Sequence, residues 1–423
     1  MKSSRLLSFG LALMLLFTPV FGASALFAAE DVTVGAIYPL TGPSAATAVD
    51  LRQGAELAIE IINGDYDLNL PLAKGRGLPN FGGKKIKYIF ADHQGSPEKS
   101  LSEAERLITK EKVVALQGTY ESSCAATASQ VAERYGVPFL SDSCSSPTLH
   151  RRNLKWFFRT SPHDAQFAEN FFKFLEELKK KKGINPKKVG IVWENTLYGT
   201  DAGKADRNLA GEYGYKIVAD IPYTARSAEL TSEIQKIKMS KPDVIFHAAY
   251  VSDAMLYVRG YKEMDVNFDM IFGHGGGFLD SAFRTQLGTD ANYICSWEVW
   301  ASDLAKSKPM VATVNDMFKK KYGRDMNGHS ARAFTGVFVL ADAINRAGST
   351  EPKAIQQALR NTNIPGEKTI MPWTNIAFDK NGQNTGGSGI IVQIQDQAFK
   401  TIWPFEFAST DVVWPMPKWS ERK

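Results

Sequence analysis

Two hydroxyl-rich segments contain the residues whose types and spacing best suit ligand binding. Residues 118–123 lie between an expected strand and an expected helix, and residues 141–147 follow the next expected strand. A helix N-terminus presents free N–H groups and a partial positive charge, which suit a carboxylate. Ligands of open α/β sheets bind at the carboxyl ends of strands. Serine at such places is also an ordinary helix cap, so a binding site and a purely structural role both remain open.

The sequence lacks most catalytic signatures. His274 and the three glycines after it look like the oxyanion-hole segment of esterases, but the G-x-S-x-G pentapeptide of that class does not occur. There is no H-E-x-x-H pair for zinc, and the glycines near Lys84 do not have the spacing of a phosphate-binding loop. We therefore expect no enzyme activity, no metal site and no cofactor.

Composition points to a globular protein of two or three domains. The chain has 423 residues, of which 44% are apolar and 22% are charged. Its 50 basic and 45 acidic residues give a net charge of +5 and no basic stripe, so we expect no nucleic-acid partner. Three cysteines cannot form a disulfide framework.

The first 25 residues have the pattern of a secretory signal peptide. Lys2 and Arg5 precede an apolar run over residues 6–20, and a small-x-small cleavage site follows at residues 23–25. The apolar run is short for a membrane anchor, which needs about 20 residues. We expect a cleaved leader over residues 1–25 and a soluble product in the periplasm.

Behind the leader, short apolar runs alternate with helical patterns. This alternation predicts parallel sheets covered on both faces, and the rhythm restarts near residue 160, which predicts two α/β lobes. Residues 308–361 are predicted to form two or three helices, and residues 376–413 short strands. The expected strands of the lobes are 32–37, 86–91, 113–116, 138–141, 189–193, 216–219, 244–248 and 270–272.

Several segments resemble periplasmic solute-binding proteins of the type I fold, in particular the leucine/isoleucine/valine-binding branch that serves ABC importers. The resemblance extends over nearly all of the chain behind the leader. Its landmarks, in order, are VGAIYPLTGP (34–43), GAELA (54–58), AD (91–92), the two serine segments, YG (198–199) and KPD (241–243).

That resemblance implies two doubly wound lobes that are joined by three hinge crossings and close on the ligand. The crossings would fall near residues 159–162, 296–301 and 372–378. The first lobe would comprise 26–160 and 300–373, and the second 161–299 and 374–423.

The resemblance also implies a set of ligand-binding residues. Ser122 matches the serine that holds a ligand carboxylate, and Ser143 and Ser145 match the small-residue loop beside it. Tyr120 and Cys144 would line the side-chain pocket, and Tyr198 and Tyr250 would close on it from the second lobe.

Two positions depart from the family pattern. The aromatic residue of the first loop is replaced by Thr47, and the acid that neutralises an α-ammonium is replaced by Gly275. A buried ammonium without a counter-charge is costly. Either the ligand has no α-amine, or Asp142, Glu121 or Asp253 replaces the acid.

Four further residues have two interpretations each. His274 could stack on a ligand ring or belong to the core, and Arg332 could hold an anion or have a structural role. Some relatives in the wider group bind aromatic carboxylates. Cys124 and Cys144 lie in neighbouring loops and could form a disulfide or pack as reduced thiols.

Two functions follow. The first is a monomeric periplasmic protein that delivers a small carboxylate, either like a branched-chain amino acid or an aromatic or other organic acid, to an ABC permease and ATPase. The second is a ligand-sensing receptor domain of the same fold.

Overall fold

The computed structural model describes residues 31–422, so the expected leader lies outside the described residues. The chain forms two α/β lobes, each built around its own main sheet. The sheet of the first lobe has five parallel strands in the order β2-β1-β3-β4-β5. They are β1 (Val32–Tyr38), β2 (Ile86–Asp92), β3 (Leu116–Gly118), β4 (Phe139–Ser141) and β5 (Phe157–Arg159).

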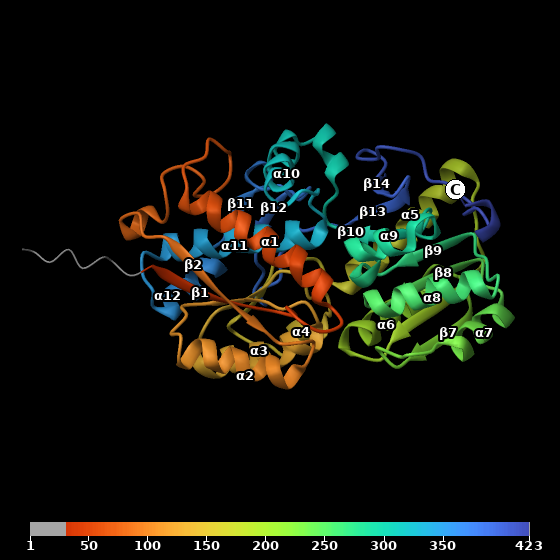
Figure 1. Ribbon diagram of the computed structural model, residues 1–423, viewed down its shortest axis with the longest axis horizontal. Coiled ribbons are helices and arrows are strands. Elements are labelled where there is room, and N and C mark those ends of the chain that lie inside the picture. Colours follow the sequence, from red (N-terminus) through yellow and green to blue (C-terminus); the bar gives the residue numbers. More distant parts are fainter. Residues whose placement is uncertain (1–30, 423) are drawn as a thin grey trace, which may run out of the picture. The chain divides into compact units, whose positions relative to one another are not determined.

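Helices cover both faces of this sheet because successive residues of a buried strand point to opposite sides. Val34 and Ala36 of β1 join the core under α1 and α11, whereas Ile37 joins the core under α2 and α3 (Figure 1). The helices of the first lobe are α1 (Ala45–Asn63), α2 (Pro97–Thr109), α3 (Ser122–Tyr135), α4 (Thr148–Arg151), α10 (Pro309–Tyr322), α11 (Gly328–Ala347) and α12 (Pro352–Arg360).

The sheet of the second lobe has seven strands in the order β14-β13-β10-β9-β8-β6-β7. Its helices are α5 (Asp164–Lys182), α6 (Leu197–Glu212), α7 (Thr231–Ser240), α8 (Val251–Glu263) and α9 (Ser281–Leu287). Its strands are β6 (Lys188–Glu194), β7 (Lys216–Tyr223), β8 (Val244–Ala248), β9 (Met270–Gly273), β10 (Cys295–Glu298), β13 (Ile390–Gln395) and β14 (Ala398–Trp403).

The C-terminal strands add an antiparallel edge to the otherwise parallel second sheet. β13 pairs antiparallel with β10, and β14 pairs antiparallel with β13. A tight turn joins them, in which Asp396 and Gln397 have φ values of 50° and 63°. Two consecutive residues with positive φ are typical of a hairpin turn, and a hairpin makes its strands antiparallel. A separate two-stranded sheet consists of β11 (Asn363–Pro365) and β12 (Asn375–Ala377).

The alternating pattern is confirmed, but one strand was placed wrongly. The strand expected at 113–116 is β3, Leu116–Gly118, because pairing with β1 begins only where Leu116 meets Gly35. The helix starts follow local signals: the Ser96 side chain accepts a hydrogen bond from the backbone N–H of Lys99 at 3.2 Å and so caps α2.

The chain passes between the two main sheets three times, after β5, after β10 and after β12. Arg159 ties the first and third passages together, since its guanidinium donates to Ser146 O at 2.7 Å and to Gln383 Oε1 at 2.8 Å. The lobe boundaries given above stay a prediction.

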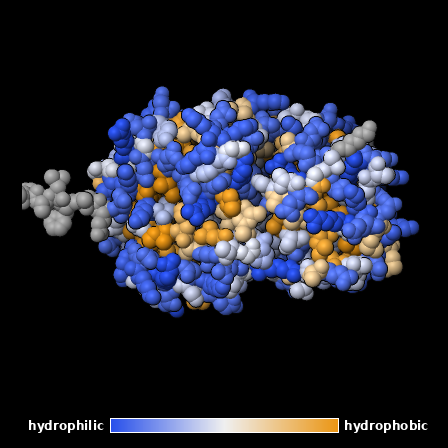
Figure 2. Space-filling view, viewed as in Figure 1, coloured by the Kyte–Doolittle hydropathy of each residue, from blue (hydrophilic) through white to orange (hydrophobic). Residues whose placement is uncertain are grey.

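Apolar side chains fill the interiors of both lobes, and the face in Figure 2 is mostly hydrophilic, with apolar residues in groups between the polar ones. Within residues 31–422, no helix combines the length and the apolar character that crossing a membrane requires.

Candidate ligand-binding site

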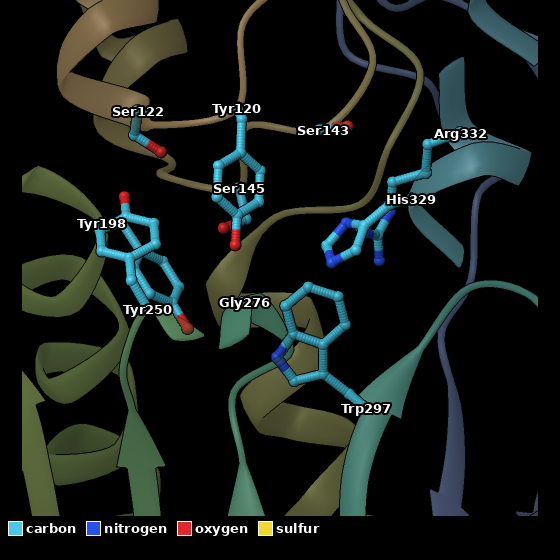
Figure 3. A pocket seen from close by; sticks show the side chains of 10 residues that line it. All are labelled: Tyr120, Ser122, Ser143, Ser145, Tyr198, Tyr250, Gly276, Trp297, His329 and Arg332. Atoms are coloured by element: carbon cyan, nitrogen blue, oxygen red, sulfur yellow. The ribbon is translucent and has the colours of Figure 1, made fainter. Parts of the chain in front are cut away.

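A small cavity of about 20 Å³ lies where the two lobes meet (Figure 3). Its walls come from both lobes, and the lining residues are Tyr120, Ser122, Ser143, Ser145, Tyr198, Tyr250, Gly276, Trp297, His329 and Arg332.

The two serine segments lie side by side at the carboxyl ends of β3 and β4. The backbone N–H of Ser146 donates to Ser122 Oγ at 3.3 Å, which joins the two segments. Ser122 is the first residue of α3, and the cap residue Glu121 makes no side-chain hydrogen bond to that helix. The first turn of α3 therefore directs its N–H groups and partial positive charge towards this end of the cavity.

Aromatic rings form the walls. The Tyr120 and Tyr250 rings approach edge to face across the lobe boundary, with centroids 5.6 Å apart, and the Tyr198 ring lies 5.3 Å from the Tyr250 ring. The Trp297 ring stacks on Phe167 at 3.6 Å. All four lining rings are at most 7% exposed, so the cavity is closed to solvent in this conformation.

One lining side chain is charged, and a buried carboxylate outside the lining pairs with it. Arg332 is 2% exposed and pairs with Glu298 through Nη2 and Oε1 at 3.0 Å. Burial, reinforced by the Arg332 charge, lowers the pKa of His329 to about 3, so His329 is neutral near pH 7. The ten lining residues include no carboxylate.

Three predicted site residues do not line the cavity. The Thr47 hydroxyl instead donates to Asp280 Oδ2 at 2.5 Å, which joins the first lobe to the second. The Cys144 thiol donates to Tyr120 O at 3.4 Å. His274 Nε2 contacts Asp206 Oδ2 at 2.7 Å inside the second lobe. The other seven predicted residues come together around the cavity.

The backbone explains why no acidic side chain occupies position 275. Gly275 has a φ of 60°, and a Cβ added there would lie 2.4 Å from the Trp297 ring. The three acids considered as replacements do not line the cavity. Asp142 accepts from the Tyr38 hydroxyl at 2.5 Å, Glu121 accepts from the Ser44 hydroxyl at 2.8 Å, and Asp253 accepts from the backbone N–H of Arg226 at 2.9 Å.

Gly276, Trp297 and His329 line the cavity and were not among the predicted site residues. His329 lies one turn before Arg332 on α11, and this i, i+3 spacing was the available signal. Trp297 lies on β10, inside the crossing expected at 296–301, and its large indole ring beside a strand end was the other signal.

All three cysteines are free and buried, so the reduced alternative holds for Cys124 and Cys144. Burial raises the pKa of the Cys144 thiol to about 12. Neither thiol is therefore set up as a nucleophile.

One buried group in the described part of the chain has metal-ligand residue types, namely His93, Glu121 and Cys124. The backbone N–H of Gly95 donates to His93 Nδ1 at 3.0 Å, so the proton of the neutral ring lies on Nε2. That nitrogen faces Glu121 Oε2 at 3.4 Å. A protonated Nε2 cannot bind a metal ion, and the geometry is that of a histidine beside a carboxyl group.

The fold is that of a solute-binding protein of type I. It has two sheets with covering helices, three connections between the lobes and a closed cavity at the lobe boundary. The chain belongs to the periplasmic binding protein family, whose sequence profile matches residues 31–398. It is 29% identical over 400 residues to the Leu/Ile/Val-binding protein homolog 7 of Brucella suis biovar 1, covering 93% of this chain and 96% of that relative.

Solved structures show the same fold. A leucine-binding protein from Thermotoga maritima superposes with a TM-score of 0.75 at 19% identity, covering 88% of this chain and 97% of that one. A solute-binding protein of an ABC transporter from R. palustris, in complex with benzoate, superposes with a TM-score of 0.74 at 17% identity, covering 88% and 96%.

Proposed function

We propose that this protein captures a small carboxylate without an α-ammonium group, most simply an aromatic acid, in the cavity between its lobes. The observation that carries this proposal is that the ten residues lining the cavity include no carboxylate. An α-ammonium buried there would have no counter-charge on the cavity wall, and a buried unpaired charge is strongly unfavourable.

The cavity also offers partners for the ligand's carboxylate and for its apolar body. A carboxylate beside Ser122 would meet hydroxyl donors and the N-terminus of α3, and both favour a negative charge. A planar apolar body would contact the faces and edges of four aromatic rings, those of Tyr120, Tyr198, Tyr250 and Trp297. The benzoate bound by the R. palustris protein is a ligand of this kind.

We also propose that the protein works in the periplasm, after removal of its leader, and delivers its ligand to an ABC permease and ATPase. Two lobes connected by three passages can open to admit a ligand and close around it, so that the ligand stabilises the closed form. Membership in the periplasmic binding protein family supports this role.

Replacing Ser122 by alanine tests the carboxylate end. The change removes a hydrogen bond to a charged group, worth about 1.5–3 kcal/mol, so the Kd for benzoate should rise about tenfold or more. Titration calorimetry with benzoate and with leucine measures both affinities. Ser123→Ala is the matched control, because Ser123 is the next residue of α3 and does not line the cavity.

Benzoate should bind more tightly than leucine to the unaltered protein. Equal benzoate affinity in Ser122→Ala and the unaltered protein would show that the serine loops do not bind the ligand. Tight leucine binding would contradict a ligand without an α-amine.

A further inference from the structure

A second hollow lies at the lobe boundary, apart from the ligand cavity. Its volume is about 360 Å³, and the two share no lining residue. One wall belongs to the second lobe and comes from α9 and β14, whereas the other belongs to the first lobe and comes from the end of α10 and the loop before α11 (Figure 1). Residues 300–302, where the chain passes between the lobes after β10, also line it.

The walls of this hollow carry more positive than negative charge. Their charged side chains are Arg284, Lys319, Arg324 and Asp325. Lys319 Nζ lies 3.3 Å from Asp325 Oδ1, and Arg324 forms an ion pair with the buried carboxylate of Asp50. Two of the three cations therefore have a carboxylate partner, and the positive charge that remains is that of Arg284.

Arg284 is held in place without a counter-ion. Its Nη1 donates to Gln397 O at 2.7 Å, and its guanidinium carbon lies 4.6 Å from the centre of the Phe399 ring. Among the described residues, neither a hydrogen bond nor an ion pair joins Arg284 to a carboxylate. Asp280, at the start of the same helix, instead accepts hydrogen bonds from Thr47 and from the helix backbone.

The polar side-chain atoms that the walls leave without partners are donors. Three buried lining atoms have no hydrogen-bond partner among the described residues, namely Arg284 Nε, Arg324 Nη1 and Trp300 Nε1. Arg324 Nη1 has the ionic contact with Asp50 instead. Guanidinium and indole N–H groups donate and cannot accept, so an occupant of the hollow must bring acceptor atoms.

We propose that this hollow binds a small oxyanion at Arg284, with a phosphate, sulfate or carboxylate centre, and that the bound anion holds the two lobes together. A guanidinium binds such anions through charge-assisted hydrogen bonds. Arg284 belongs to the second lobe, whereas Lys319 and Arg324 belong to the first. An anion between them is attracted from both sides and stabilises the closed form. The hollow is thus an effector site, separate from the ligand cavity.

Inorganic phosphate tests the site on the full-length mature protein, with sodium chloride at equal ionic strength as the reference. Phosphate should raise the midpoint of thermal unfolding more than chloride does, because an anion that binds only the folded form stabilises it by mass action. Titration calorimetry with phosphate, sulfate and acetate then shows which centre the site prefers. If all three oxyanions act only as chloride does, the proposal is overturned.

Two variants assign the binding to the charge of Arg284. Arg284→Met keeps an apolar stem against Phe399 and leaves no carboxylate without its partner, so the protein should fold. The Kd for phosphate should rise about tenfold or more, the factor that corresponds to one charge-assisted hydrogen bond. Arg284→Lys keeps the charge and should bind phosphate more tightly than Arg284→Met. Equal affinity in the two variants would overturn recognition by this charge.

Arg360→Met is the matched control. Arg360 also lies over an aromatic ring, that of Phe158, at 5.6 Å, and it also donates to a backbone oxygen, Lys155 O, at 2.8 Å. It does not line the hollow. Arg360→Met should therefore leave the Kd for phosphate unchanged, and an equal loss in Arg284→Met and Arg360→Met would overturn a specific site.

Small-angle X-ray scattering tests whether the anion joins the lobes. Phosphate should lower the radius of gyration of the ligand-free protein, and Arg284→Met should abolish this effect. Phosphate and benzoate should also raise each other's affinity by the same factor, several-fold, because coupling between two sites is reciprocal. Phosphate that binds without lowering the radius of gyration overturns the bridging role.

The two proposals fail in different ways. Benzoate binding without phosphate binding overturns the effector site and leaves the proposed function in place. Phosphate binding at Arg284 with the expected change in scattering, but without binding of any organic carboxylate in the ligand cavity, supports the effector site and contradicts the proposed function.

Discussion

Thr47 offers the sharpest test of how the two lobes are held together. Its hydroxyl donates to Asp280 Oδ2 at 2.5 Å, and neither side chain is exposed to solvent. Burial raises the pKa of Asp280 to about 6, with the Thr47 hydrogen bond acting in the opposite direction, so the carboxyl is mostly ionised at pH 7. Thr47→Val keeps the side-chain shape and removes the hydroxyl.

The magnitude follows from the charge on the acceptor. A hydrogen bond to a charged group contributes about 1.5–3 kcal/mol. Thr47 belongs to α1 of the first lobe and Asp280 precedes α9 of the second, so the bond exists only while the lobes are together. Its loss disfavours the closed form by this amount, and ligand affinity should fall roughly ten- to hundredfold.

Comparing the loss of affinity for two ligands distinguishes a contact between the lobes from a contact with the ligand. A bond that acts only on closure weakens benzoate and 4-hydroxybenzoate by the same factor in titration calorimetry. Thr313→Val is the control, because Thr313 is exposed on α10 and its hydroxyl reaches only Pro309 O, at 3.4 Å. Unchanged affinity in Thr47→Val, or a factor that differs between the two probes, would refute this reasoning.

Two further predictions concern pH and export. Burial raises the pKa of Glu121 to about 7 from 4.5, so the folded protein holds a proton that the unfolded chain has lost. The free energy of unfolding should therefore decrease by up to about 3 kcal/mol as pH rises from about 4.5 to 7, at about 1.36 kcal/mol per pKa unit. Thermal unfolding measured from pH 5 to pH 8 should show that the free energy of unfolding decreases less with pH in Glu121→Gln than in the unaltered protein. An equal pH dependence in the two proteins would contradict the assignment of this effect to Glu121. Mass spectrometry of protein from the native host should find a mature N-terminus near residues 26–30, and an intact Met1 would contradict export.

The fold was largely predictable because its signals are local. Apolar periodicity and caps such as Ser96 are properties of a few neighbouring residues, and they place most of the helices and strands. The bounds of β3 depend on pairing with β1, which is a long-range property that the local apolar run at 113–116 does not contain. The antiparallel edge formed by β13 and β14 depends likewise on where the hairpin docks.

The site was predictable at the level of loops and less so at the level of side chains. Loops after parallel strands must meet at one sheet edge, so Ser122, Ser143 and Ser145 come together. Cys144 lies between two lining serines but its thiol points to Tyr120 O, because the side-chain direction changes from one residue to the next. Trp297 reaches the cavity from a strand near a crossing, and only the packing of both lobes determines that position.

The cavity itself gives a reason for ligand-driven closure. Contacts such as that of Arg226 with Gly95 O at 3.1 Å and that of the Thr148 N–H with Asp201 at 3.2 Å join the lobes without any ligand. Closure also buries Trp297 Nε1 and Arg332 Nε, neither of which has a hydrogen-bond partner among the described residues, and each buried unsatisfied donor costs about 1–3 kcal/mol. Ligand acceptors that pair with these donors would remove that cost in the closed form only, since water can satisfy the donors when the lobes are apart. A ligand whose acceptor atoms lie near these donors therefore stabilises the closed form. Tight binding and closure of the lobes then depend on the same chemical groups of the ligand.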